Sequence, residues 1–270
     1  MDASHRALPS DWDQGRDGIS AMITGEGARI VVKRRRHAPP GFFAAEATGL
    51  AALSAARALR TPRVVAVSAR AIALEDLGRG RPSDDDWARA GAALAALHAR
   101  RGGAFGFGCD GFVGDTPQDN RPEADGFRFF AERRLQPLTR RARDLGMLDA
   151  NQTGRIDRLC ARLADWLPES PAVLVHGDLW LGNLHACTNG ELALIDAGAV
   201  HYGWAAGDLA MLTLFAAPPP SLFAAYEAQG GIADWRASSP LLNLYPLLNH
   251  LCLFGAGYRA SVQAVLDRYG

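Results

Sequence analysis

The sequence has few cysteines, no long apolar run and no net charge, and each of these features excludes a class of protein. Its four cysteines show no CxxC or CxxxH spacing, so neither a zinc site nor a disulfide framework is expected. No apolar run is long enough to span a bilayer, and the start MDASHRALPSDWDQ lacks the apolar core of a signal peptide. We therefore expect a cytoplasmic protein with reduced thiols and no membrane partner.

Charge and composition favour chemistry on small molecules. The 29 basic and 29 acidic residues cancel, so no overall field attracts nucleic acid or an anionic surface. With 48% hydrophobic residues, a chain of 270 residues can bury a large core in one domain or in two lobes. The oligomeric state is left open by the composition, and we favour a monomer.

The segment 173–215 carries the clearest pattern of a catalytic site. Asp178 follows the apolar run VLV, Asn183 comes five residues later, and Asp196 ends a second apolar run. Short apolar strands hold small polar groups rigidly at their ends. Phosphoryl transfer needs such groups, because a carboxylate must accept the proton of the acceptor hydroxyl and oxygen ligands must hold Mg²⁺ against nucleotide phosphates.

The order of these residues repeats that of a kinase catalytic loop followed by its metal-binding segment. Asp178 is the predicted base, Asn183 and Asp196 are the predicted metal ligands, and ATP and Mg²⁺ are the predicted cofactors. Taken singly, His-Gly-Asp and Ile-Asp are more often turns or helix caps. Their joint spacing, with a hairpin-like turn at 188–191 between them, favours the kinase-like interpretation.

The first eighty residues predict a small antiparallel sheet and one helix. Two apolar runs flank Gly25-Glu26-Gly27, as in a hairpin, and Lys33 ends the second run. Glu46 lies at the edge of the apolar stripe of a helix predicted at 42–57. A strand Lys paired with a helix Glu anchors nucleotide phosphates in kinases, although each could be an ordinary boundary residue. Two further strands are expected at 64–67 and 71–74.

The stretch Glu75-Asp76-Leu77-Gly78 has the composition of a linker. We place the boundary there, between an N-terminal nucleotide-binding lobe (1–77) and a C-terminal catalytic and substrate-binding lobe (78–270). The backbone at Glu75 and Leu77 is expected to bind the base of ATP.

The rest of the chain is predicted to be mainly helical. Ser83 is the expected cap of a helix over 84–101, in which His98 continues the apolar stripe and is expected to pack. The glycine-rich stretch 105–120 has no period and is predicted to be an ordered loop. Basic faces of the helices between 127 and 167 are interpreted as solvent-exposed.

Two predictions concern the C-terminal helices. Asp208 is the expected N-cap of a helix over 209–215. The segment 241–257 is too apolar for a surface helix, is interrupted by Pro246, and is expected to pack inside the second lobe.

The sequence resembles the fructosamine (ketosamine) kinases, which are related to aminoglycoside phosphotransferases and share the protein-kinase-like fold. The similarity runs from about Lys33 to the C-terminus and is carried by HGDLWLGN at 176–183, VGDTPQ at 113–118, FFAERRLQP at 129–137 and LLNHLCLFGAGY at 247–258. It implies a two-lobed α+β fold, with a small N-terminal antiparallel sheet lobe and a larger, mainly helical C-terminal lobe. It also implies ATP-dependent phosphorylation of a sugar hydroxyl on a ketosamine, which would serve protein deglycation, and the same roles for the site residues named above.

The chain departs from the family pattern near the nucleotide phosphates and on the acceptor side. The N-terminal loop GRDGISAMIT lacks the Asn of the family's GGxINxAY, and Ala197-Gly198-Ala199 replaces a Pro-Ala pair after Asp196. The acceptor, a ketosamine or other glycated amine, is expected to contact Trp180, two residues past the base, because aromatic faces pack against sugar conjugates. Asn249 and His250, polar in an apolar helix, are the other expected acceptor contacts.

Other functions stay open at this point. The same enzyme class could act on an amino alcohol or an aminoglycoside-like compound. A nucleotide-binding pseudokinase is a second alternative, which the retained Lys33, Asp178, Asn183 and Asp196 argue against. A metal-dependent hydrolase lacks the His-rich ligand set that it would need.

Overall fold

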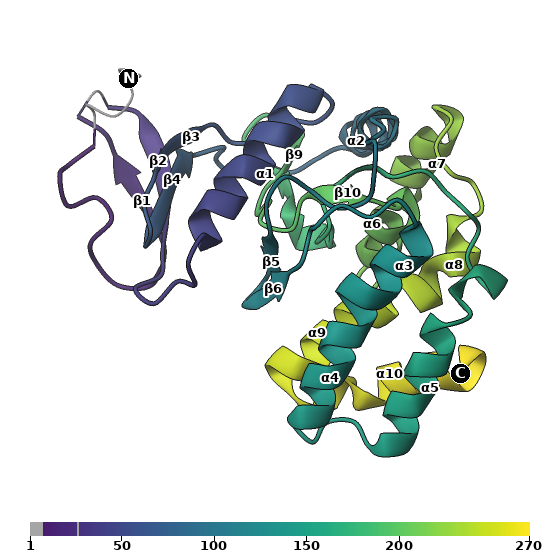
Figure 1. The fold of residues 1–270 in the computed structure, drawn as a ribbon. Helices are drawn as coiled ribbons and strands as arrows, with labels where there is room; N and C mark the ends of the chain where they lie inside the picture. Colours follow the sequence, from purple (N-terminus) through teal and green to yellow (C-terminus); the bar gives the residue numbers. More distant parts are fainter. Residues whose placement is uncertain (1–7, 26) are drawn as a thin grey trace.

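The N-terminal part of the chain is a four-stranded antiparallel sheet with one helix beside it (Figure 1). The computed structural model describes residues 8–25 and 27–270. The strands are β1 (Gly18–Ile23), β2 (Arg29–Arg34), β3 (Val64–Val67) and β4 (Ala71–Glu75), in the order β1-β2-β4-β3. The predicted strands and the hairpin between β1 and β2 are confirmed, although Glu26 in its turn lies outside the described residues.

Helix α1 (Phe42–Ala56) lies between this sheet and the rest of the molecule (Figure 1). It begins after Gly41, whose positive φ of 81° suits a residue without a side chain. Phe43 and Leu50 are buried on it and belong to the same apolar cluster as Ile72 of β4 and Leu94 of α2 (Asp84–His98). The main core therefore continues from the sheet through α1 into the C-terminal part.

The C-terminal part is mainly helical, with short strands within 111–118 and 173–203. Its helices after α2 are α3 (Gly126–Phe130), α4 (Gln136–Asp144), α5 (Ala150–Cys160), α6 (Ala205–Leu212), α7 (Pro220–Ala228), α8 (Trp235–Leu242), α9 (Leu244–Phe254) and α10 (Arg259–Tyr269). Its strands form three antiparallel pairs: β5 (Gly111–Val113) with β6 (Thr116–Gln118), β7 (Val173–Val175) with β10 (His201–Gly203), and β8 (Leu184–Ala186) with β9 (Leu192–Leu194). Across the described residues, no helix combines the length and apolar character that crossing a membrane requires.

Several predicted elements are confirmed. Ser83 caps α2 through a reciprocal capping box with Asp86, and His98 at the end of the helix is buried and hydrogen-bonded. The β8–β9 hairpin has its turn where the sequence places it. The apolar segment 241–257 is mostly buried as far as Leu251, in the end of α8 and in α9, whereas none of its last six residues is buried and Phe254 is 67% exposed.

Other predictions are wrong in detail. The stretch 105–120 is not a plain loop, since it contains the β5–β6 hairpin. The apolar segment 241–257 breaks at Asn243 and not at Pro246, because Pro246 lies in the first turn of α9, where its missing N–H is tolerated. The basic face that begins at 127 is not wholly solvated: Arg134 is only 2% exposed, in a π-helical turn (Ala131–Leu135) between α3 and α4.

The chain between β4 and α2 is hydrogen-bonded to the β8–β9 hairpin. The carbonyl oxygen of Leu77 accepts from the Thr188 amide (3.1 Å), and His185 Nε2 contacts the carbonyl oxygen of Gly78 (2.6 Å). The Gly80 amide donates to the carbonyl oxygen of Ala186 (3.0 Å). We propose that the two lobes divide here, between residues 77 and 78, because the sheet ends before this linker and the helical part begins after it.

Candidate active site

The catalytic loop predicted at 176–183 follows β7 directly and is fixed by the buried ring of His176. The amide of Asp178 contacts His176 Nδ1 (3.3 Å), and Nε2 lies 2.9 Å from the carbonyl oxygen of Ile195. Since an amide only donates and a carbonyl only accepts, Nε2 must carry the proton. The ring therefore joins the loop of Asp178 to the strand end that carries Asp196.

Asp208 holds the same loop from the opposite side. Its carboxylate accepts from the amides of His176 (2.7 Å) and Gly177 (2.9 Å) and lies 3.3 Å from His98 Nε2. Burial opposes ionisation, but the contacts with His98 and the His176 amide outweigh it, so the pKa of Asp208 is lowered. The predicted N-cap role is wrong: α6 begins at Ala205, and Asp208 lies in its first turn.

Asp178 has the environment of a base that works near neutral pH. Burial, together with the charges of Asp196 and Asp208, raises its pKa to about 7, while its contact with Asn183 opposes the rise. Asn183 donates through Nδ2 to the backbone carbonyl of Asp178 (2.7 Å) and approaches its carboxylate (3.4 Å). A base whose pKa lies close to the working pH combines availability with proton affinity.

Lys33, Glu46 and Asp196 meet where the sheet, α1 and the end of β9 come together. Lys33 Nζ lies 2.5 Å from Glu46 Oε1 and 3.0 Å from Asp196 Oδ1. Burial lowers the pKa of Lys33, but the two carboxylates outweigh it and the net shift is upward, so the amine stays charged. The predicted pairing of Lys33 with Glu46 is therefore present, and its role toward ATP stays a prediction.

Asp196 has an uncommon backbone conformation. Its φ is +61°, in the left-handed region that residues other than Gly, Asn and Asp seldom adopt. Its side chain is 58% exposed, so the carboxylate faces solvent on the side of Lys33. Asn183 and Asp196 offer an amide oxygen and a carboxylate, a donor set that suits Mg²⁺ completed by phosphate oxygens and water.

Glu75 and Leu77 are the linker residues whose backbone is predicted to bind the nucleotide base, and this stays a prediction. The amide of Glu75 donates to the carbonyl oxygen of Arg63 (2.9 Å). The carboxylate of Glu75 is occupied by Arg60 Nη2 (2.8 Å) and the Arg63 amide (3.2 Å). Within the part of the chain that the structure describes, the amide of Leu77 has no hydrogen-bond partner. This amide is the linker group that is available to a nucleotide base.

A groove with a volume of about 390 Å³ opens beside Asp178, and we call it the aromatic groove. Trp180, Asn249 and His250, the three expected acceptor contacts, all line it with Asp178. Trp180 is 43% exposed. Aromatic side chains from three further positions complete the wall: Phe215, Phe254 and Tyr258.

The two polar residues of the groove differ in what they can offer a ligand. Asn249 is buried, its Oδ1 accepts from the hydroxyl of Thr116, and its Nδ2 donates to the carbonyl oxygen of Val113 (3.3 Å). Its amide thus fixes the β5–β6 hairpin on α9. His250 Nδ1 donates to the carbonyl oxygen of Pro246 (2.7 Å), which leaves Nε2 as an acceptor when the ring is neutral.

Comparison with known proteins gives one consistent family. A profile described as fructosamine kinase matches residues 15–269. A Synechocystis protein assigned as a ketoamine kinase is 38% identical over 254 residues, which cover 92% of this chain and 84% of that protein. A protein-ribulosamine 3-kinase of Arabidopsis thaliana is 33% identical over 263 residues, 93% of this chain and 79% of that protein.

Solved structures show the same fold. A Thermobifida fusca protein assigned as a fructosamine-3-kinase superposes with a TM-score of 0.87 at 33% identity, over 94% of this chain and 91% of its own. A macrolide 2'-phosphotransferase superposes with a TM-score of 0.54 at 16% identity, over 93% of this chain and 87% of its own. The second similarity is one of fold alone.

Proposed function

Because this chain belongs to the fructosamine kinase family, we propose that it transfers the γ-phosphoryl group of ATP to a sugar hydroxyl of a ketosamine, an amine glycated by a sugar. The observation that carries this proposal is the position of Asp178. This carboxylate, whose pKa is raised to about 7, lines the same groove as Trp180 and is close enough to Asp196 for that charge to raise its pKa.

The nucleotide would occupy the space between the sheet and the catalytic loop. The Leu77 amide and the backbone of Glu75 would bind the base, and Lys33, held by Glu46, would bind phosphate oxygens. Asn183 and Asp196 would hold Mg²⁺, which neutralises phosphate charge when it is bound.

Asp178 would accept the proton of the acceptor hydroxyl as the oxygen of that hydroxyl bonds to the γ-phosphorus and ADP leaves. Two hydrogen bonds keep the backbone of Asp178 in place for this step. The Asp178 amide donates to His176, and the Asp178 carbonyl oxygen accepts from Asn183. The raised pKa favours uptake of the proton at neutral pH.

The base assignment is tested by Asp178→Asn. An amide keeps the shape of the side chain and cannot accept the proton, so we expect turnover of a glycated lysine to fall by about 10²–10⁴-fold. ADP release in the presence of ATP and Mg²⁺ measures turnover, and a nucleotide titration should show nearly unchanged ATP affinity. Near-full turnover by the variant would show that another group is the base.

The acceptor assignment is tested by Trp180→Ala. Loss of the aromatic face should raise the acceptor KM about tenfold or more, about 1.4 kcal/mol, with little change in the KM for ATP. Trp166 is a matched control, because it is equally exposed but packs edge to face against Tyr269 and does not line the groove. Trp166→Ala should leave both KM values unchanged.

The same assay separates ketosamines from other acceptors. In a panel of glycated lysines, amino sugars and amino alcohols, we expect the ketosamine to be preferred over its parent amine and its free sugar. An acceptor that lacks a sugar hydroxyl leaves the group that binds this hydroxyl without a hydrogen-bond partner, which lowers its kcat/KM. Equal turnover of simple amino alcohols, or a Trp180 variant that changes only the KM for ATP, would favour the second candidate, a phosphotransferase for amino-alcohol or aminoglycoside-like compounds.

A further inference from the structure

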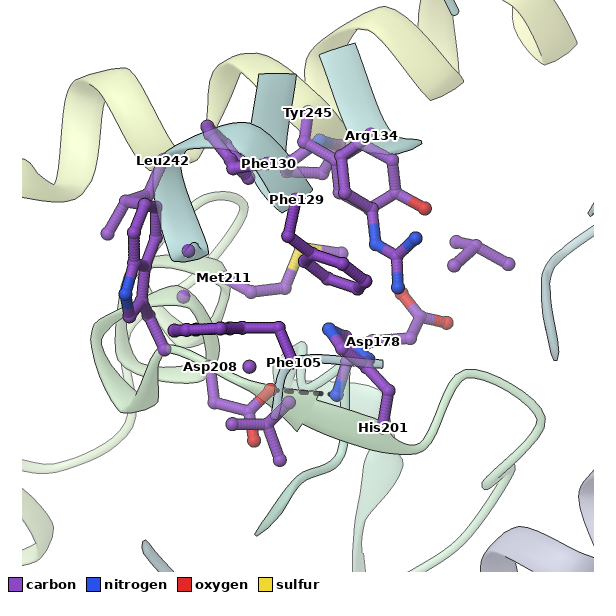
Figure 2. Close-up of a pocket in the computed structure, with 18 residues that line it drawn as sticks. Phe105, Phe129, Phe130, Arg134, Asp178, His201, Asp208, Met211, Leu242 and Tyr245 are labelled. Carbon is purple, nitrogen blue, oxygen red and sulfur yellow. Dashed lines mark hydrogen bonds between the residues drawn. The ribbon is translucent and has the colours of Figure 1, made fainter. Parts of the chain in front are cut away.

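A second cavity, of about 70 Å³, adjoins the aromatic groove, and the buried side chain of Arg134 lines it (Figure 2). Val113, Asp178 and Met211 line both spaces, so the two meet at the proposed base. Aromatic side chains form part of the remaining cavity wall, and among them are Phe129 and Tyr245. A cavity of about 10–15 Å³ holds one water molecule, so this cavity has room for several waters or for a compact organic group.

Arg134 lies in the wall of this cavity, and all its hydrogen-bond partners are neutral. Nη1 donates to the carbonyl oxygens of Asp119 (2.8 Å) and Arg133 (3.1 Å), and Nη2 donates to Asn120 Oδ1 (2.6 Å). Within the described residues, no carboxylate forms an ion pair with it. The guanidinium lies over the ring of Phe129, with Cζ 4.4 Å from the centroid.

One edge of this guanidinium is unused. A guanidinium has five N–H groups, and these contacts account for three of them. Nε has no partner although it is fully buried, and Nη2 keeps a second hydrogen. Nε and Nη2 are the pair that a carboxylate engages side-on with two parallel hydrogen bonds.

Neither of the two carboxylates in the cavity wall binds the unused edge of Arg134. Asp208 is already bound by His98 and by the amides of His176 and Gly177. Within the described residues, Asp178 forms no hydrogen bond or ion pair with Arg134. His201, also in the wall, adds no second cation, because burial lowers its pKa to about 3.

The three N–H groups of Arg134 that have partners can have a purely structural role, because they join residues 119–120 to the π-helical turn. This role does not explain a cation buried without an anion next to an open space, since buried charges are normally paired. π-Helical turns also occur frequently at functional sites.

We propose that this cavity is an anion subsite of the acceptor site, in which the unused edge of Arg134 receives the carboxylate of a free glycated amino acid. The inference rests on the proposed function, because it places the sugar hydroxyl at Asp178 and the amino-acid carboxylate in the cavity behind it. The acceptors would then include low-molecular-weight ketosamines with a carboxylate near the glycated nitrogen.

A matched pair of acceptors tests this in the unmodified protein. N-fructosyl-glycine and N-fructosyl-glycinamide have the same shape and differ in the negative charge. We expect kcat/KM to be at least tenfold higher for the acid, mainly through KM. Equal kcat/KM values for the two acceptors would overturn the proposal.

Arg134→Gln and Arg133→Gln form the matched pair of variants. Arg133 is the neighbouring arginine, bonds to Asp119 and does not line the cavity. The acid-to-amide ratio should fall to about one in the Arg134 variant and stay unchanged in the Arg133 variant. An acid-to-amide ratio of kcat/KM that stays high in Arg134→Gln would overturn the assignment of this residue. If that variant does not fold, the ratio in the unmodified protein decides whether the subsite exists.

A binding measurement separates this proposal from the proposed function. ¹³C-labelled propionate should bind saturably to the unmodified protein and to Arg133→Gln, as seen by NMR line broadening, and not to Arg134→Gln. If the protein phosphorylates neither ketosamine, the proposed function has failed and this titration alone decides whether the subsite exists. Absence of saturable binding in that case would overturn the subsite as well.

Discussion

Asp178 affects the stability of the fold as well as the proposed chemistry. Its pKa is raised from an ordinary value of 3.8 to about 7. Between these two pH values the unfolded chain binds fewer protons than the folded protein, so the free energy of unfolding falls as the pH rises through this window. Above about pH 7 the full penalty of a buried carboxylate remains.

Asp178→Asn should therefore stabilise the metal-free protein at high pH. We expect its Tm to exceed that of the unmodified protein by about 2 °C or more at pH 8, since 1 kcal/mol shifts Tm by about 2–4 °C in a chain of this size. The difference should vanish near pH 4, where both side chains are neutral. Differential scanning calorimetry across this range measures it.

Asp165→Asn serves as the control for this experiment. Asp165 is exposed and pairs with Arg162 on the surface, so its replacement should change Tm little at either pH. A lower Tm for Asp178→Asn at pH 8 would contradict the destabilising role of the ionised Asp178.

The sequence predicts the contact between Lys33 and Glu46 better than it predicts the surroundings of the candidate site. Lys33 and Glu46 can be paired from the sequence because Lys33 ends a recognisable apolar run and Glu46 borders a recognisable apolar stripe of a helix. Arg134 was misplaced because a π-helical turn inserts one extra residue, which rotates the following side chains by about 100° relative to an α-helix. No composition signal distinguishes such a turn from an ordinary basic helix.

At the scale of elements, the first turn of α6 supports the loop 176–183, in which the base is predicted. Because the helix begins at Ala205, Asp208 points back toward the end of β7 and binds the two amides that precede Asp178. The sequence places the helix start four residues too late, since Asp is a favoured N-cap and Trp204 carries no capping signal.

Asp208→Asn should impair both stability and turnover. The amide keeps one acceptor oxygen but directs an NH₂ group at donors, so we expect unfolding to become easier by about 3 kcal/mol. We also expect kcat to fall about tenfold or more, with little change in the KM for ATP. Urea denaturation and steady-state kinetics measure the two effects.

Asp157→Asn on α5 is the control, because that side chain is exposed. It should leave stability and kcat unchanged. A normal kcat in Asp208→Asn, together with reduced stability, would limit Asp208 to a packing role.

The β5–β6 hairpin, whose strands have three residues each, is an element that the sequence did not resolve. The β5–β6 hairpin contains Gly111 and Pro117, residues of low strand propensity, and its position depends on Asn249 of α9 far along the chain. Such long-range contacts are invisible to local periodicity. The longer helices, in contrast, repeat their apolar stripe often enough to be found.

At the scale of the whole molecule, α1 approaches the segment that carries Asp196 through a glycine. A Cβ at Gly49 would overlap the backbone carbonyl of Ala197, the residue after Asp196. This close approach keeps Glu46 next to Lys33, which in turn contacts Asp196.

Gly49→Ala should therefore be harmful although Ala favours helices. We expect loss of stability and at least a tenfold rise in the KM for ATP, because α1 must move away from the Asp196 segment. Gly154→Ala is the control, since Gly154 lies in α5 with only ordinary contacts around it, and it should stabilise by about 0.5–1 kcal/mol. Thermal unfolding and ATP kinetics measure both variants; a Gly49 variant as stable and active as its control would show that this approach is not needed.

The attachment of the inter-lobe linker to the β8–β9 hairpin bears on how the chain is degraded. Arg79 is exposed and would be a tryptic site in a loose connection. Its neighbours Gly78 and Gly80 are bonded to the hairpin through a carbonyl and an amide, so the backbone cannot extend into a protease cleft without breaking those bonds. Cleavage between the lobes thus requires local unfolding of the hairpin, and the lifetime of the chain in the presence of proteases depends on the strength of that attachment.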